Sequence, residues 1–256
     1  MQTSYELMVA PIGARLTKAD HPALPITAPE IAATAQACQA AGATAIHVHV
    51  RDGQGRHALA PDLYAAALDH IARASDIHVQ VSTEAAGVFD PQTQMECLAA
   101  VPARDASVAL RELSGNPDAY VTAQTRGVDV QHILYTPDEV TALLQHFDRA
   151  EIPEQSRRAI FVLGRYSDGP QSDPRDLAPF VNAMGDAGLR WSACAFGAQE
   201  HACMLAALDL GGQVRIGFEN SYVSADGTVY PDNATSVSAF VAAADARGYQ
   251  PGGAST

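Results

Sequence analysis

The chain has 256 residues, 47% of them hydrophobic, and a formal net charge of −13 at pH 7. This length allows one large domain, and the lack of a basic cluster argues against binding to nucleic acid or an anionic membrane. No apolar run approaches the roughly 18 residues of a membrane span, and the N-terminus does not resemble a signal peptide. The spacing of the cysteines is not typical of metal ligands, so they are predicted to be reduced thiols, which favours a cytoplasmic protein. The four cysteines are Cys38, Cys97, Cys194 and Cys203.

Strand patterns alternate with helix patterns along the whole chain. Strands are predicted at residues 5–12, 45–52, 77–82, 106–110, 132–135, 159–163, 191–195 and 214–216. Helices are predicted from residue 61 to at least residue 71, and at residues 27–41, 90–100, 117–125, 136–150, 173–187, 199–210 and 233–247. Capping signals support several helix starts, among them Thr27 with Glu30 and Thr136 with Glu139.

Eight successive strand–helix units without a dividing linker favour a closed (β/α)8 TIM barrel in a single domain, residues 1–256. The alternative is an open doubly wound sheet, which predicts a glycine-rich phosphate-binding turn after the first strand. The segment at residues 11–15, Pro-Ile-Gly-Ala-Arg, does not supply one. Residues 248–256 follow the last helix and are expected to form a loose tail.

Two histidines lie two residues apart in the second predicted strand. Side chains alternate faces along a strand, so His47 and His49 point the same way and can share a metal ion. A strand of a closed barrel is buried on both faces, and buried imidazoles need polar partners. The pair therefore indicates a metal site rather than two unrelated surface histidines.

A catalytic zinc ion usually takes three protein ligands and keeps one position open. In a (β/α)8 barrel, the third ligand should come from the C-terminal end of another strand. Glu219 follows the last strand, which lies two positions around the barrel from the second, and is the preferred third ligand. Glu84, after the third strand, is the rival.

Two arginines also follow strands. Arg215 lies four residues before Glu219, where it could anchor a substrate carboxylate or, with equal weight, form an ion pair inside the barrel. Arg165 follows the sixth strand and is expected to pair with Asp168 more than to serve an anionic ligand.

These motifs together resemble the β-keto acid cleavage enzymes, a family of zinc-dependent (β/α)8 proteins. The pairing of His-x-His-x-Arg-Asp with a late Arg-x-Gly-x-Glu is fairly specific, whereas each motif alone is weak. The matching segments span nearly the whole chain in the family's order: residues 13–18, 41–52, 82–83 and 215–220.

The resemblance implies an activity and a set of site residues. The family condenses a β-keto acid with an acyl-CoA, usually acetyl-CoA, and releases acetoacetate and a new CoA thioester through a retro-Claisen-type cleavage. By this resemblance Zn²⁺ is bound by His47, His49 and Glu219, and a homo-oligomer, usually a tetramer, is expected. It also implies catalytic roles for Arg215, Asn220 and Ser82, and substrate contacts for Arg15, Thr83 and Ser107.

Two positions depart from well-known family members, which carry Glu at position 15 and Asp at position 220. Asn220 is an amide and cannot act as a carboxylate base, so either another group abstracts the proton or Asn220 only positions the substrate. Arg15 should reject a cationic substrate side chain and accept a neutral or anionic one. The sequence does not name the β-keto acid.

Two other functions remain open. A zinc hydrolase on the same barrel would need further histidines and an aspartate at later strand ends, where His132 alone is available near a strand start. A metal-containing binding barrel without catalysis is kept open by Asn220. Acetyl-CoA-dependent release of acetoacetate separates these functions.

Overall fold

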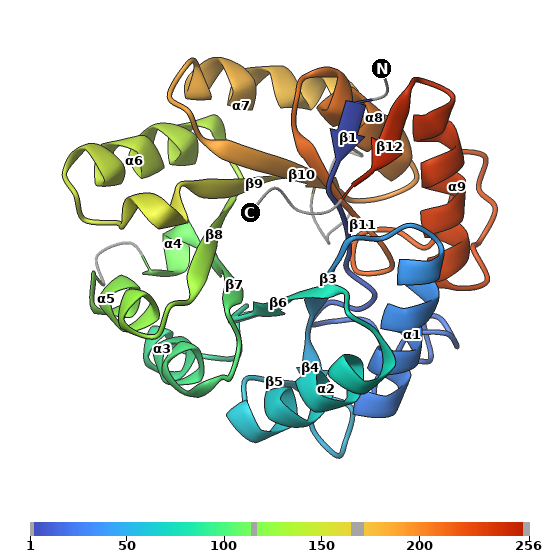
Figure 1. The fold of residues 1–256 in the computed structure, drawn as a ribbon, viewed down its shortest axis with the longest axis horizontal. Helices are drawn as coiled ribbons and strands as arrows, with labels where there is room; N and C mark the ends of the chain where they lie inside the picture. The colour runs from blue at the N-terminus through green and yellow to red at the C-terminus, as the bar shows by residue number, and fades with distance from the viewer. Residues whose placement is uncertain (1–2, 114–116, 165–171, 253–256) are drawn as a thin grey trace.

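Eight parallel strands close into a barrel in the computed structural model, which describes residues 3–113, 117–164 and 172–252 (Figure 1). Around the barrel the order is β10, β11, β2, β3, β6, β7, β8 and β9, and β9 pairs with β10 to close it. This confirms the predicted (β/α)8 barrel. The strand bounds are β2 (Leu7–Val9), β3 (Ala45–Val48), β6 (His78–Ser82), β7 (Asp105–Ala109), β8 (Asp129–Leu134), β9 (Arg158–Leu163), β10 (Arg190–Ala195) and β11 (Gln213–Ile216).

Helices form a ring outside the barrel (Figure 1). The predicted capping boxes are present: Thr27 and Glu30 close the first turn of α1, and Thr136 and Glu139 that of α6. Each box satisfies backbone N–H groups that a helix start otherwise leaves without partners. The α-helices are α1 (Ala28–Ala40), α2 (Pro61–Ala74), α3 (Pro91–Ala100), α4 (Leu110–Leu113), α5 (Pro117–Thr125), α6 (Pro137–Asp148), α7 (Leu177–Met184), α8 (Glu200–Asp209) and α9 (Asn233–Asp245).

The two ends of the chain differ from the prediction. The expected strand at residues 5–12 is two short strands, β1 (Thr3–Tyr5) and β2, because they pair with different neighbours. The expected loose tail is also wrong in part, since Tyr249–Pro251 form β12, which pairs in parallel with β1 (Figure 1). Backbone hydrogen bonds, including one from Thr3 N to Gly248 O at 3.0 Å, hold this segment in place.

Three smaller differences concern turns. The helix expected at 173–187 is a 3-10 turn, η2 (Pro174–Asp176), followed by α7, which ends at Met184 because Gly185 adopts a positive φ of 52°. A second 3-10 turn, η1 (Glu154–Ser156), precedes β9. After β3 the chain forms an antiparallel pair, β4 (Val50–Arg51) with β5 (His57–Ala58). Arg165 and Asp168 lie outside the described residues.

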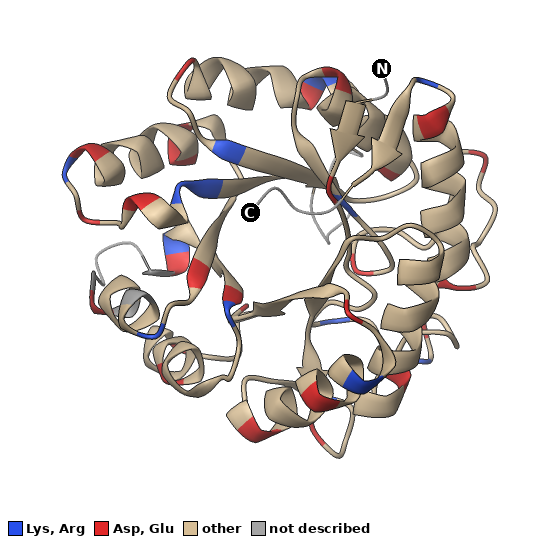
Figure 2. Cartoon of the chain, in the orientation of Figure 1, with Lys and Arg blue, Asp and Glu red and all other residues tan. Residues whose placement is uncertain are grey.

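The main apolar core lies between the strands and the helices, and large buried side chains such as Ile46, Tyr64 and Phe240 fill it. The barrel interior also holds buried polar side chains, among them Gln80 and Gln131. Lys and Arg residues are dispersed among the helices and strand ends in Figure 2. Among the described residues, no helix is both long and apolar enough to cross a membrane.

Candidate metal centre at the barrel mouth

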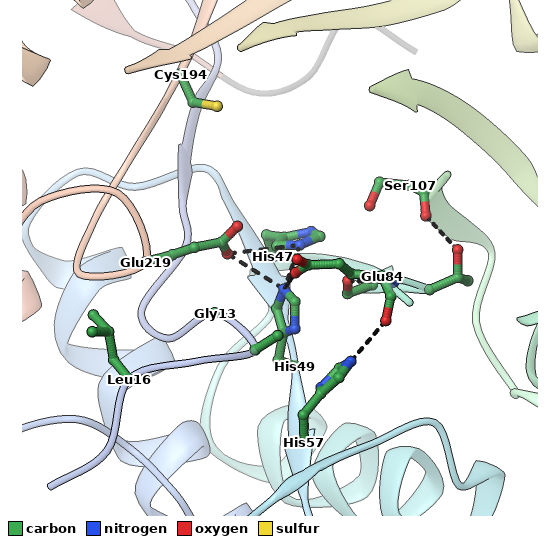
Figure 3. Close-up of polar contacts among 12 residues, drawn as sticks. Gly13, Leu16, His47, His49, His57, Glu84, Ser107, Cys194 and Glu219 are labelled. Atoms are coloured by element: carbon green, nitrogen blue, oxygen red, sulfur yellow. Dashed lines mark hydrogen bonds and ion pairs between the residues drawn. The ribbon is translucent and has the colours of Figure 1, made fainter. Parts of the chain in front are cut away.

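The two histidines of the His-x-His motif converge at the C-terminal end of β3 (Figure 3). His47 is the third residue of this strand, and His49 follows its last residue. Both imidazoles are buried, and their Nε2 atoms lie 3.2 Å apart. The other ring nitrogen of His47, Nδ1, is 2.9 Å from Gln80 Oε1. The predicted shared face of the strand is therefore observed, with both Nε2 atoms directed at one point.

Glu219 completes this cluster from the turn after β11. Its Oε2 lies 3.4 Å from His49 Nε2 and 3.8 Å from His47 Nε2 (Figure 3). Strands β11 and β3 both pair with β2, which explains how residues so distant in the sequence meet. The preference for Glu219 over Glu84 agrees with this geometry, because the described residues that could hold a metal ion together are His47, His49 and Glu219.

The turn that carries Glu219 is held by hydrogen bonds from three directions. The N–H of Glu219 donates to Ala10 O at 3.0 Å. The N–H of Gly217 donates to the buried Glu200 carboxyl at 3.0 Å, and that of Phe218 to Asn233 Oδ1 at 3.0 Å. These contacts fix the backbone at Glu219 and at the two residues before it, so the fold sets the position of the carboxylate.

The donor set fits a divalent metal ion such as zinc. The three ligand atoms lie within 4.8 Å of one another and are buried. Burial lowers the pKa of His47 to about 3, which keeps its imidazole neutral and able to ligate. Burial alone would raise the pKa of Glu219, but Arg215 and the two histidines outweigh it and hold that pKa well below its usual range. Two neutral imidazoles and one carboxylate leave a bound divalent ion with net positive charge and an open position.

Arg215 forms the interior ion pair that was one of its two predicted roles. Its Nη2 donates to Glu219 Oε1 at 3.1 Å and lies 3.4 Å from Cys194 Sγ. Both charged side chains are buried, so each needs the other to offset the loss of hydration. Arg215 thus orients the carboxylate that faces the histidines.

The cavity beside the cluster is lined by polar, aromatic and aliphatic residues. The three candidate ligands line it together with Ser82, Glu84 and Arg215, and the other lining residues are Ile133, Tyr135, Val162 and Phe196. Burial raises the pKa of Glu84, and the nearby Glu219 raises it further, whereas His49 and Arg15 oppose the shift. Glu84 Oε2 lies 3.9 Å from His49 Nε2, at the edge of the cluster.

The remaining predicted residues are not all brought into the cavity. Ser82 lines it, and its Oγ accepts a hydrogen bond from Glu84 N at 3.1 Å. Thr83 uses its hydroxyl to hold the barrel, donating to Ser107 O at 2.9 Å. The side chains of Ser107 and Asn220 are buried and have no hydrogen-bond partner among the described residues. Neither lines the cavity that the described residues enclose. Arg15 is exposed and interacts electrostatically with Glu84.

Several contributors were missed by reading the sequence. Gln80 contacts a candidate ligand, while Glu200 and Asn233 support the turn of another. His57 is a further contributor that the sequence does not single out. Its Nε2 lies 2.8 Å from Glu84 O, and its ring centroid is 5.3 Å from that of His49. A usable signal existed for Gln80, because an isolated polar residue within an apolar strand needs a polar partner.

Residues 6–255 match the beta-keto acid cleavage enzyme family. The chain belongs to this family. It is 27% identical over 251 residues to the 3-oxoadipate:acetyl-CoA acetyltransferase of Cupriavidus necator, covering 92% of this chain and 87% of that protein. It is 25% identical over 236 residues to the 3-keto-5-aminohexanoate cleavage enzyme of Fusobacterium nucleatum, covering 86% and 84%.

The fold of this family member also resembles that of ObcA in its apo structure, with a TM-score of 0.67 and 16% sequence identity. The match covers 91% of this chain and 64% of the ObcA chain, so this chain spans somewhat less than two thirds of that protein. At this identity the likeness shows a shared barrel fold.

Proposed function

We propose that the protein is a zinc-dependent acyltransferase that transfers acyl groups between a β-keto acid and acetyl-CoA. The bond between C2 and C3 of the keto acid breaks, and its carboxymethyl carbon forms a bond to the acetyl group, giving acetoacetate. The remaining acyl group leaves on CoA as a new thioester. The observation that carries this proposal is the convergence of His47, His49 and Glu219 at the barrel mouth of a family member.

The chain's own residues supply a preorganised and charged site. When bound, zinc supplies a Lewis acid that can polarise a carbonyl oxygen. Burial keeps the His47 imidazole neutral by lowering its pKa, and Arg215 keeps Glu219 ionised by lowering its pKa, so these two donors are ready to ligate. Arg215 keeps Glu219 directed at the histidines and adds positive charge where an anionic substrate would arrive.

Buried polar side chains near the mouth are proposed to contact the substrate. Ser82 lines the cavity. The Ser107 hydroxyl and the Asn220 amide are buried without partners among the described residues, a costly state that a polar ligand would relieve. The amide of Asn220 can donate to an oxygen that gains negative charge, but it cannot accept the proton of a general base. Proton abstraction in this chain is therefore assigned to a group other than Asn220.

Arg15 is proposed to select the substrate by charge. It is exposed near the mouth and close enough to Glu84 to oppose the rise in the pKa of that carboxyl. A guanidinium repels an ammonium group, so we propose a β-keto acid with a neutral or anionic tail. The relative from Cupriavidus necator is named for 3-oxoadipate, which has an anionic tail. 3-Oxoadipate is therefore the first substrate to test.

The test combines metal analysis with product detection. The purified protein should carry about one zinc ion per chain, as a three-ligand site implies. With acetyl-CoA and a suitable β-keto acid it should release acetoacetate in proportion to the new thioester. The double variant His47→Ala with His49→Ala should lose both metal and activity. A matched pair of histidines outside the site, in the variant His70→Ala with His146→Ala, should retain both.

Other outcomes would point to the two rival functions. Hydrolysis without any need for acetyl-CoA would favour a zinc hydrolase on the same barrel. Tight binding of a keto acid without turnover would favour a non-catalytic binding barrel, which the amide at Asn220 makes a real alternative. Unchanged metal content in the His47 and His49 double variant would refute the metal assignment.

The proposal includes a cytoplasmic homo-oligomer, a tetramer by analogy with the family. The four cysteines are free and buried, as expected of a protein kept in a reducing compartment. Light scattering coupled to size-exclusion chromatography measures the subunit count directly. A mass of one chain in solution would refute the oligomer.

A further inference from the structure

We infer that Gln80 is a positioning residue that selects the metal-binding tautomer of His47 and fixes its ring. Gln80 is the third residue of β6 and is fully buried inside the barrel. Its register partner on the neighbouring strand is His47, and Gln80 Oε1 lies 2.9 Å from His47 Nδ1. This inference rests on the metal centre of the proposed function.

The orientation of the Gln80 amide is set by its other contacts. Its Nε2 donates to Asp105 Oδ1 at 3.1 Å and to Gln131 Oε1 at 3.1 Å. An ionised carboxylate accepts hydrogen bonds and cannot donate them, so a flipped amide would place two oxygens against each other. The contact with Asp105 therefore directs Gln80 Oε1 toward His47.

Asp105 is a firm anchor for this chain of contacts. Its Oδ2 accepts a hydrogen bond from His78 Nε2 at 2.8 Å and from the Arg158 guanidinium at 3.1 Å. Burial alone would raise the pKa of Asp105, but His78 and Arg158 outweigh it and lower that pKa, so the carboxylate stays ionised. A second branch runs from Gln131 Nε2 to Ser192 Oγ at 3.1 Å. The contacts thus extend from the mouth toward the opposite end of the barrel.

The consequence for His47 follows from hydrogen-bond chemistry. An amide oxygen only accepts, so it stabilises the imidazole that carries its proton on Nδ1. In that tautomer the lone pair is on Nε2, the atom that faces His49 and Glu219. A neutral imidazole whose Nδ1 has no fixed acceptor would populate both tautomers and could rotate. Gln80 therefore preorganises His47 as a ligand.

The first measurement uses the unmodified protein without metal. Two-dimensional ¹⁵N–¹H NMR of the imidazole nitrogens should show His47 in the Nδ1–H form. A predominant Nε2–H form would overturn the inference whatever any variant does. Zinc binding by the same protein tests the proposed function separately, because failure to bind zinc at all would refute the metal centre.

Three variants then separate positioning from general stability. Gln80→Met keeps the volume but removes the acceptor, so zinc affinity should fall about 10- to 100-fold. Gln131→Met is the matched control: it also removes a buried amide that touches Gln80. It leaves the contact of Gln80 with Asp105 in place, so zinc affinity should change less than about threefold.

Gln80→Glu is the rescue variant. It keeps an oxygen facing His47 but adds negative charge beside Asp105. The metal-free protein should therefore unfold at a lower temperature than Gln80→Met, yet bind zinc nearly as tightly as the unmodified chain. A chelator competition assay gives the zinc affinities, and thermal unfolding of the metal-free proteins gives the stabilities. Zinc affinities that follow the unfolding temperatures in all variants would overturn the inference.

Discussion

Replacing Gly217 with alanine should disturb the turn that carries Glu219 more than any comparable change at a surface glycine. Gly217 adopts a φ of +132°, a backbone conformation that side-chain-bearing residues rarely take. A Cβ at this position would lie 2.5 Å from Ala10 O and 2.9 Å from Ala10 C. Both atoms belong to the backbone, so a side-chain rotation cannot relieve the overlap.

The expected loss of stability in Gly217→Ala has two causes, the disfavoured φ and the overlap of the new Cβ with the Ala10 backbone. A disfavoured φ costs about 1–3 kcal/mol, and the overlap with the β2 backbone adds to it, giving about 3 kcal/mol or more for Gly217→Ala. For a chain of this size that corresponds to a fall of roughly 6–12 °C in the unfolding temperature. The zinc affinity should fall as well, because Glu219 is two residues away and its N–H bonds to the same Ala10 oxygen.

Gly227→Ala is the matched control. Gly227 also has a positive φ, +86°, but a Cβ there would meet nothing within 4 Å. Gly227→Ala should lower the free energy of unfolding by about 1 kcal/mol through the backbone conformation alone, and it should leave zinc affinity unchanged. Chemical denaturation of the metal-free proteins and chelator competition measure the two effects. If the two alanine variants behave alike in both assays, the contact with Ala10 does not constrain the metal site.

Three further predictions concern charge. Burial raises the pKa of Glu200 well above its usual range, so the carboxyl is neutral. Glu200→Gln should therefore retain zinc affinity. Glu200→Leu leaves the Gly217 N–H without an acceptor and should lower zinc affinity in the chelator competition assay. A hydrogen bond to Asp105 raises the pKa of His78. The stability that this pair contributes is therefore complete below about pH 6.5 and lost as the pH rises through the higher folded pKa. Because the His78 side chain is 44% exposed, the loss in free energy of unfolding should be under about 1 kcal/mol. Urea unfolding should show that the free energy of unfolding of His78→Gln varies less with pH, between about pH 6 and 9, than that of the unmodified protein. Arg15→Glu should shift kcat/KM toward amino-bearing β-keto acids by about tenfold or more, as one charge contact at a mouth allows; an unchanged preference would exclude Arg15 from substrate selection.

The candidate ligand cluster could be predicted because the C-terminal ends of the strands meet at one mouth of a (β/α)8 barrel. The alternation of His47 and His49 fixed their common face, and the mouth of a (β/α)8 barrel supplied the reason to look for Glu219 at another strand end. The capping boxes at Thr27 and Thr136 could also be predicted, because each joins residues that are only three apart in the sequence.

The supporting contacts could not be predicted because they depend on register between strands. Gln80 meets His47 only through the pairing of β3 with β6, which the spacing in the sequence does not reveal. The same holds for Glu200, whose acceptor role depends on how α8 packs under β11. The strand at Tyr249–Pro251 was missed because its partner lies at the opposite end of the chain.

The position of β2 has a consequence for the stability of the barrel if the candidate metal centre is occupied. This strand lies between β3 and β11, so the candidate ligands on its two sides come from the early and the late part of the chain. An ion shared by them would span the seam where the barrel is closed by the chain's two ends. Metal binding should then slow the exchange of amide hydrogens along β2, even though this strand supplies no ligand. A bound ion would thus stabilise the closed barrel in addition to its role in the reaction.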